Sequence, residues 1–301
     1  MSKTIAVCNQ KGGVGKTTTA VNLGAYLAAM GKHTLLVDLD AQGNATLASG
    51  VDRTSLSRTC YDLFVDGAPA EEIVVKSIVE GLDVIPANLD LAGAELRLSQ
   101  MVERESVLRR LCDGWRGRYE AIVFDCPPSL GLMTVNALVA ADRVLIPVQC
   151  EYLALEGLTT LLQAIEMVRR AHNPDLSIGG IVLTMMDPRA NLTREVAQEV
   201  RGFFKDLVFE TAIPRNVRLA ESPSFGKPIC AYDPHSTGAL AYRLLAREGC
   251  VKILDKGEPV QPVVAAGFST NPMEQLRDTS GSRLGLPPAR TSSLSSALIS
   301  G

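Results

Sequence analysis

The chain has 301 residues, of which 46% are hydrophobic, and its formal net charge is −3 at pH 7. This balance suits a globular protein and gives no overall attraction to nucleic acid, so DNA binding would need a local basic patch. No hydrophobic run approaches the roughly 20 residues of a membrane helix, and we expect no signal peptide. The seven cysteines contain no C-x-x-C pair, which indicates reduced thiols rather than a zinc site or a disulfide framework.

Strand-like and helical patterns alternate along the chain. Apolar runs typical of buried strands occupy residues 4–8, 34–39, 82–85, 121–124, 144–148, 178–184 and 208–212. Helical patterns occupy residues 17–30, 104–112, 130–140, 155–171, 193–206 and 238–247. The alternation predicts an α/β fold with a doubly wound, mostly parallel sheet flanked by helices, in which ligands bind at the carboxyl ends of the strands.

The composition changes after about residue 256. Residues 257–301 are rich in Ser, Pro, Gly and Thr, and they show too little apolar periodicity to form a core. We therefore predict one domain over residues 1–256, followed by a flexible, disordered tail over residues 257–301.

A glycine-rich turn with two lysines follows the first apolar run, as Asn-Gln-Lys-Gly-Gly-Val-Gly-Lys-Thr-Thr-Thr at residues 9–19. Between a strand and a helix, such a turn points backbone N–H groups at an anion. Lys16 would reach the β- and γ-phosphates, and the Thr17 hydroxyl would ligate Mg²⁺. The turn departs from the usual phosphate-loop pattern because Gln10 replaces its first glycine, and Lys11 adds a second lysine.

Carboxylates follow two of the predicted strands. Asp38 and Asp40 lie two residues apart, so one could help to hold a metal while the other positions a water; the alternative is an ordinary polar strand end. Asp125 closes the apolar run at 121–124, as in the second motif of nucleotide-binding proteins, whose aspartate holds Mg²⁺ through water. Residues 127–131 follow as a possible switch loop that responds to the γ-phosphate.

These segments carry a resemblance. Residues 11–18, 38–46 and 125–129 are similar to the motifs of the deviant-Walker ATPases. Residues 148–157, 213–223 and 226–229 narrow the resemblance to the ParA/Soj chromosome-partitioning ATPases, over roughly residues 2–250.

The resemblance implies ATP and Mg²⁺ as cofactors and a role for each matching residue. Lys11 would reach across a dimer to the partner's ATP, and Asp40 would orient the attacking water; with Lys16, these form the catalytic set. The metal would be held by Thr17, Asp40 and Asp125. The nucleotide would be bound by Lys11, Gly12, Gly13, Val14, Gly15, Lys16, Thr17 and Thr18, with Pro214 and Asn216 near the adenine.

The resemblance also implies a cycle and partners. MgATP would join two subunits, the homodimer would bind double-stranded DNA non-specifically through Arg189 and Arg218, and a ParB-type centromere-binding protein would stimulate slow hydrolysis. Such a protein would be cytoplasmic and nucleoid-associated, without a membrane partner. Similar proteins often carry further basic residues near the C-terminal helix, whereas this chain has Ala231, His235 and Thr237 there. This departure could weaken DNA binding or shift it to Arg215, Arg243 and Arg247. Neither the cargo, chromosome or plasmid, nor the role of the tail follows from the sequence.

Three alternatives remain open at this point. A membrane-positioning ATPase of the MinD kind would need a basic amphipathic helix near the C-terminus, and residues 257–301 show none. An iron–sulfur ATPase would use a cysteine pair, for which Cys126 and Cys150 are candidates. A DNA-binding scaffold that uses ATP without hydrolysing it would not need Asp40.

Overall fold

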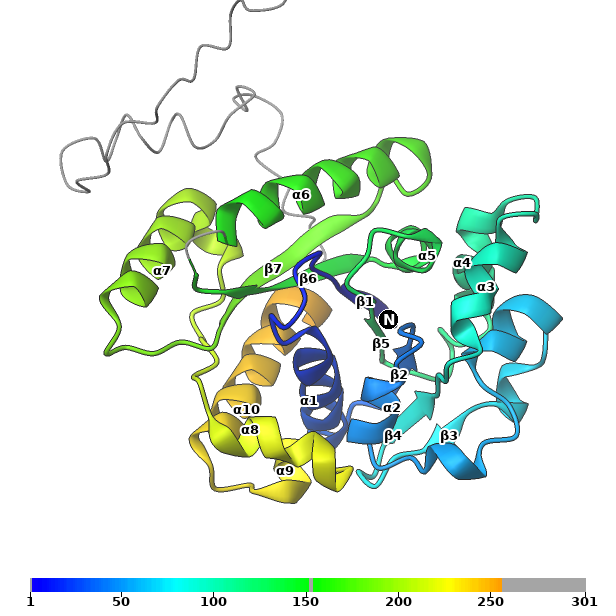
Figure 1. Ribbon diagram of the computed structural model, residues 1–301, viewed down its shortest axis with the longest axis horizontal. Helices are drawn as coiled ribbons and strands as arrows, with labels where there is room; N and C mark the ends of the chain where they lie inside the picture. Colours follow the sequence, from blue (N-terminus) through cyan, green and yellow to red (C-terminus); the bar gives the residue numbers. More distant parts are fainter. Residues whose placement is uncertain (1, 152–153, 256–301) are drawn as a thin grey trace, which may run out of the picture. The chain divides into compact units, whose positions relative to one another are not determined.

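The computed structural model describes residues 2–151 and 154–255, except for the side chains of residues 155 and 156. Within these residues, a seven-stranded sheet has the order β3-β4-β2-β5-β1-β6-β7 (Figure 1). β3 pairs antiparallel with β4, and the other strands run parallel. The strands are β1 (Lys3–Val7), β2 (Thr34–Asp38), β3 (Val75–Lys76), β4 (Leu82–Ile85), β5 (Ala121–Asp125), β6 (Arg143–Gln149) and β7 (Ser177–Thr184).

Helices cover both faces of the sheet. The side chains of α3 to α7 pack on one face, and those of α1, α2 and α8 to α10 pack on the other (Figure 1). The helices are α1 (Lys16–Ala29), α2 (Asn44–Ala48), α3 (Leu91–Leu98), α4 (Val107–Asp113), α5 (Leu132–Ala140), α6 (Ala154–Ala171), α7 (Asn191–Phe204), α8 (Val217–Glu221), α9 (Ile229–Tyr232) and α10 (Thr237–Gly249).

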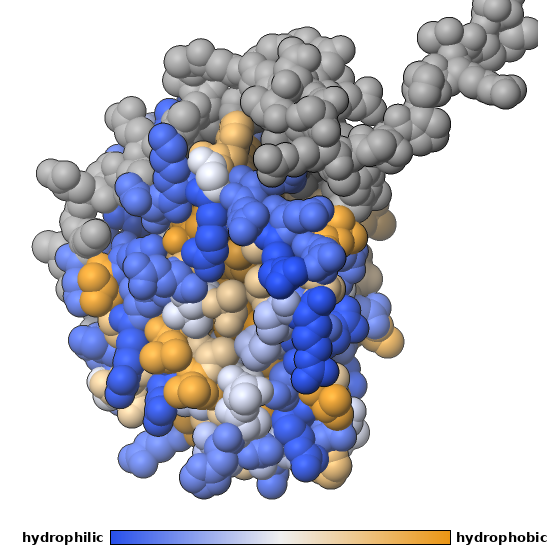
Figure 2. All heavy atoms as spheres, turned by 90° about the vertical axis from the view of Figure 1, so that its left-hand side faces the viewer, coloured by the Kyte–Doolittle hydropathy of each residue, from blue (hydrophilic) through white to orange (hydrophobic). Residues whose placement is uncertain are grey.

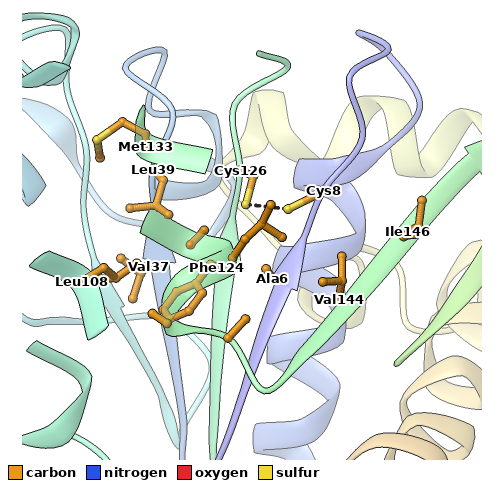
Figure 3. Close-up of a cluster of buried hydrophobic side chains, with 14 of the residues drawn as sticks. Ala6, Cys8, Val37, Leu39, Leu108, Phe124, Cys126, Met133, Val144 and Ile146 are labelled. Carbon is orange, nitrogen blue, oxygen red and sulfur yellow. Dashed lines mark hydrogen bonds between the residues drawn. The ribbon is translucent and has the colours of Figure 1, made fainter. Parts of the chain in front are cut away.

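The central strands are apolar at successive positions because both of their faces are buried. In β2, Leu35 and Val37 point into one core and Leu36 into the other. Figure 3 shows the first of these cores, where Val37 and Phe124 from neighbouring strands meet Leu108 of α4. This arrangement explains why the strands could be recognised as near-continuous apolar runs.

The predicted fold class is confirmed, but one predicted strand is wrong. Residues 208–212 form no strand; Val208 makes only an isolated bridge to Ile181. The two-residue β3 and the helices α2, α3, α8 and α9 were not predicted from the sequence. The expected tail at 257–301 lies outside the described residues. Among the described residues, we find no helix with the length and apolar character needed to cross a membrane.

Candidate nucleotide-binding site

The glycine-rich turn joins the end of β1 to the start of α1. Gly15 precedes the helix with a φ of 88°, a left-handed conformation that other residues rarely adopt, and the amides of the first helical turn follow it. The Thr184 hydroxyl at the end of β7 donates to the Val14 carbonyl oxygen over 2.9 Å, which fixes the turn against the sheet. The resulting loop can accept a phosphate at the helix N-terminus.

Lys16 is the first residue of this helix, and its side chain is largely buried. Its ammonium donates to the Lys11 carbonyl oxygen over 3.2 Å, so it curls back over the loop. Burial lowers the pKa of Lys16, while the nearby carboxylate of Asp125 opposes that change. The ammonium therefore lies between the loop and the strand-end carboxylates, where a bound phosphate would satisfy its charge.

Asp125, the last residue of β5, is fully buried, and neither of its carboxylate oxygens has a hydrogen-bond partner among the described residues. Burial raises the pKa of Asp125 well above its usual value, and the negative charge of Asp38 adds to the increase. Thr17 and Lys16 lie close enough to the carboxylate to oppose this rise in pKa. A buried, unpartnered carboxylate beside a threonine hydroxyl fits Mg²⁺, which prefers oxygen ligands and retains several waters and phosphate oxygens.

Asp38 and Asp40 do not share a role, although they lie two residues apart. Asp38 ends β2 and is fully buried, whereas Asp40 lies beyond the strand and is partly exposed. Asp38 accepts hydrogen bonds from the Thr46 amide at 2.8 Å, the Thr46 hydroxyl at 2.7 Å and the Asp40 amide at 3.2 Å. Burial raises the pKa of Asp38 to about 6. Asp38 thus holds the loop that carries Asp40, through the Asp40 amide.

The side chain of Lys11 has its partner outside the loop. Its ammonium forms an ion pair with Glu151 over 2.6 Å, and both side chains are partly exposed. Its backbone amide is held by the side chain of Asn9, which in turn donates to the Pro147 carbonyl oxygen. Glu151 was not predicted as a partner of Lys11, because nothing local in the sequence indicates a contact between residues 140 positions apart.

A pocket of about 240 Å³ opens beside the loop. Its lining includes Pro214 and Asn216, so the structure brings both predicted base-binding residues next to the start of α1. Tyr242 of α10 also lines it, which the sequence did not indicate, and its hydroxyl is 3.2 Å from that of Thr19. The lining also includes Gly15, Thr18 and Met185.

The two predicted DNA-binding arginines are exposed but differ in their surroundings. Arg218 pairs with Glu221 at 3.0 Å and with Asp233 at 3.5 Å, and the hydrogen bond to Glu221 raises its pKa. Arg189 has no ion pair among the described residues, and its backbone amide bonds to Asp187. Figure 2 shows the side of the molecule that carries α7, α8 and α10 in Figure 1, where hydrophilic side chains predominate and hydrophobic ones form small separate groups.

The cysteine arrangement gives no support to the iron–sulfur alternative. Cys126 lies against Cys8 rather than Cys150, with 3.0 Å between the two sulfur atoms (Figure 3). No group of three or more His, Cys, Asp or Glu side chains suited to a metal ion occurs in the described part of the chain.

A parallel sheet with a lysine-bearing phosphate loop and a buried strand-end aspartate defines the P-loop class of nucleotide-binding proteins. Known proteins extend this assignment. Residues 2–178 match the family model described as an AAA domain. The chain is 54% identical over 248 residues to the sporulation initiation inhibitor protein Soj of Bacillus subtilis, covering 82% of this chain and 98% of that protein. It is 51% identical to the chromosome partitioning protein ParA of Caulobacter vibrioides, over 82% of this chain and 93% of that protein.

Solved structures agree with the fold. The septum site-determining protein MinD of Pyrococcus horikoshii, complexed with Mg-ADP, has a TM-score of 0.69 at 27% identity, over 82% of this chain and 96% of that one. A cobyrinic acid a,c-diamide synthase of Mycobacterium smegmatis, with a bound ATP analogue and magnesium, has a TM-score of 0.72 at 37% identity. The match covers 82% of this chain and 93% of the synthase chain. The identities to Soj and ParA exceed that to MinD, and the chain belongs to the Soj/ParA family of chromosome-partitioning ATPases.

Proposed function

We propose that this ATPase binds ATP with Mg²⁺ between two subunits, that the dimer binds double-stranded DNA without sequence preference, and that hydrolysis releases it. The observation that carries the nucleotide part is the buried Asp125, whose two unpartnered oxygens lie beside Lys16 and Thr17. The solved neighbours that contain magnesium with ADP or an ATP analogue support the same assignment.

Each residue of the site has a distinct role in this proposal. The loop amides and Lys16 bind the phosphates, Thr17 and Asp125 hold the metal directly or through water, and Pro214 and Asn216 contact the base. Magnesium, when bound, neutralises charge that develops on the phosphate oxygens. Asp40 orients the attacking water, at a loop position that Asp38 fixes.

Lys11 has the role that makes the dimer necessary. The ammonium of Lys11 pairs with Glu151 and not with a group of the phosphate loop. The Lys11 side chain is partly exposed, so a second subunit can reach it. In the dimer, Lys11 exchanges this carboxylate for the γ-phosphate bound to the other subunit. A site that is complete only with a second subunit's cation couples nucleotide state to assembly, because transition-state stabilisation in phosphoryl transfer is largely electrostatic.

The oligomeric state tests the proposal directly. Size-exclusion chromatography with light scattering should show a dimer with Mg²⁺ and a non-hydrolysable ATP analogue, and a monomer with MgADP. The Lys11→Ala variant should bind the analogue and remain monomeric, while Lys16→Ala should lose binding of the nucleotide. A wild-type protein that stays monomeric with the analogue would refute the proposal.

DNA binding is tested separately. Arg189 and Arg218 are exposed, but Arg218 must leave two carboxylates to contact a phosphate. DNA binding should need the ATP analogue and should weaken steeply with salt. Each phosphate contact contributes about −0.9 to the slope of the logarithm of the binding constant against the logarithm of the salt concentration. The double variant Arg189→Ala, Arg218→Ala should dimerise normally and shift no DNA; undiminished binding would place the DNA surface elsewhere.

The proposal includes a cytoplasmic, nucleoid-associated location and a ParB-type protein that accelerates hydrolysis. Family membership supports both. Adding a purified ParB-type protein and DNA should raise the rate of phosphate release, and a rate that stays at its basal value would refute the partner.

A further inference from the structure

A second pocket, of about 420 Å³, lies where β6 and β7 begin. Arg143 is the first residue of β6, and Ile178 and Gly179 lie near the start of β7. Because β6 runs parallel to β1, whose end leads into the phosphate loop, these residues lie at the opposite edge of the sheet from that loop. The pocket is therefore separate from the nucleotide site.

An irregularity of the sheet shapes this pocket. The pairing of β6 with β7 shifts between Val144 and Leu145, which leaves Gly179 as an extra residue of β7. A Cβ atom on Gly179 would come within 3.1 Å of the Cβ atom of Arg143, so a side chain here would crowd the arginine. Such bulges often occur beside functional sites.

Four cationic side chains line the pocket: Arg143, Arg201, Lys205 and Lys252. Arg143 is only 6% exposed and donates to the Ser177 hydroxyl. Lys252 is paired with Glu248 over 3.0 Å, so its charge is already compensated. Arg143 therefore contributes positive charge to the base of the pocket, and the cations available to a ligand are the other two, Arg201 and Lys205.

Arg201 and Lys205 have capacity to bind an anion. Arg201 donates one bond, to the Glu210 carbonyl oxygen over 3.1 Å, from a guanidinium with five donors. Lys205 is exposed, and in the described part of the chain its ammonium has neither an ion pair nor a hydrogen bond. Its φ of 45° is a conformation that non-glycine residues seldom adopt, and such strain tends to persist at functional positions.

The pocket also has acidic lining residues. Asp206 and Glu210 are exposed, whereas Arg143 is buried. This distribution disfavours an extended polyanion, which the exposed carboxylates would repel. It suits a small molecule that carries a phosphate at one end and hydroxyl donors at the other, and the volume lies within the range of small-molecule sites.

We propose that this pocket binds a small phosphorylated metabolite, whose phosphate contacts Arg201 and Lys205 beside the buried Arg143, and whose hydroxyl groups donate to Asp206 and Glu210. The proposal does not depend on the partitioning cycle, since none of these residues belongs to the nucleotide site.

Amide NMR of the full chain tests it, with the phosphate loop first saturated with MgADP. Inorganic phosphate should cause saturable shifts of the amide signals of Gly179 and residues 205–207. Arg201→Gln and Lys205→Gln should each weaken binding by roughly tenfold, which corresponds to one charge-assisted hydrogen bond. Arg194→Gln, on the exposed surface of the same α7, should change nothing. Absent or non-saturable shifts, or binding by the Arg201 and Lys205 variants that is as tight as that of the wild type, would overturn the proposal.

Two further ligands distinguish the source of the phosphate. Ribose 5-phosphate should bind more tightly than inorganic phosphate, and its advantage should disappear in Asp206→Asn, Glu210→Gln. If it binds no more tightly, the pocket does not recognise the hydroxyl groups and the metabolite assignment fails. If a short DNA duplex displaces inorganic phosphate from these amides, the surface binds nucleic acid and the proposal is wrong.

Discussion

The carboxylate of Asp125 is costly to bury. It is buried without a partner, and burial, followed by the charge of Asp38, raises its pKa. Because the folded pKa exceeds the unfolded value, the fold binds this proton more tightly than the unfolded chain does. The stability that this proton contributes is present at low pH and is lost as the pH rises through the folded pKa.

Replacing this carboxylate should therefore stabilise the protein. With magnesium chelated at pH 7.5, Asp125→Asn should raise the free energy of unfolding in urea by about 1–3 kcal/mol, because it removes an unsatisfied buried charge. The gain should shrink as the pH is lowered, and MgATP should no longer raise the melting temperature. Asp83→Asn is the control: Asp83 accepts bonds from Lys76 and Tyr119, so its replacement should destabilise. A destabilised Asp125→Asn would contradict this account.

Asp40 should affect turnover rather than binding. Asp40→Ala should hydrolyse ATP at least about 100-fold more slowly in a single turnover, as expected for the loss of a group that positions a water or accepts its proton. With ATP itself, the variant should accumulate dimers, which chromatography would detect. Asp175→Ala removes an exposed carboxylate before β7 and should leave the rate unchanged. Normal hydrolysis by Asp40→Ala would exclude the water-positioning role.

The site was predictable where its chemistry is local in sequence. The loop at 9–19 and the strand-end Asp125 each carry their signal within a few residues, and the fold brings them together as expected. Glu151 and Tyr242 could not be predicted, because their roles depend on contacts with residues 140 and 223 positions away. A single glutamate or tyrosine in a sequence gives no indication of such a contact.

At the scale of elements, residues 208–212 show why an apolar run is not sufficient for a strand. Phe209 and Ile213 donate to β7, as a paired strand would. The amides of Glu210 and Thr211 bond instead to the Glu248 carboxylate of α10, at 2.8 and 3.0 Å. A side chain from a helix thus replaces part of the ladder. The long strands were predicted because apolar runs buried on both faces are distinctive, whereas the five-residue α2 and α8 have too few turns to show a period.

The start of α5 is another junction that the fold controls from a distance. Residues 126–131 connect β5 to α5, and Glu95 of α3 accepts a bond from the Met133 amide in the first turn over 3.3 Å. A carboxylate at a helix N-terminus satisfies a free amide and interacts favourably with the helix dipole. Glu95 therefore links α3 to the start of α5, where the loop that follows Asp125 ends.

Removing this link should loosen the loop. Glu95→Ala should lower the free energy of unfolding by about 1 kcal/mol, the usual cost of a lost helix cap, and hydrogen exchange should increase in residues 126–133. Leu96→Ala, at a 70% exposed position of the same helix, is the matched control and should change neither quantity. Unchanged exchange in Glu95→Ala would show that the bond does not order the loop.

For the whole molecule, the proposed dimer gives the Lys11–Glu151 pair an effect on assembly. In the proposed dimer Lys11 contacts the nucleotide of the other subunit, so the 2.6 Å bond to Glu151 favours the monomer. Glu151→Gln removes the charge that competes for Lys11. The pair is partly exposed, and such pairs contribute about 0.2–1 kcal/mol each. A symmetric dimer gives up two of them, one per subunit, so the protein concentration needed for dimerisation should fall by up to about thirtyfold.

Sedimentation velocity with Mg²⁺ and a non-hydrolysable ATP analogue measures this shift, and the difference from wild type should narrow as salt screens the pair. Glu120→Gln is the control, since Glu120 forms a similarly exposed pair with Lys32 over 3.2 Å. Its chain segment, just before the first residue of β5, lies at the edge of the sheet opposite the phosphate loop, so dimerisation should be unaffected. If Glu151→Gln dimerises no more readily than wild type, or less readily, then Glu151 does not compete with the nucleotide for Lys11, and the monomer is favoured by some other contact.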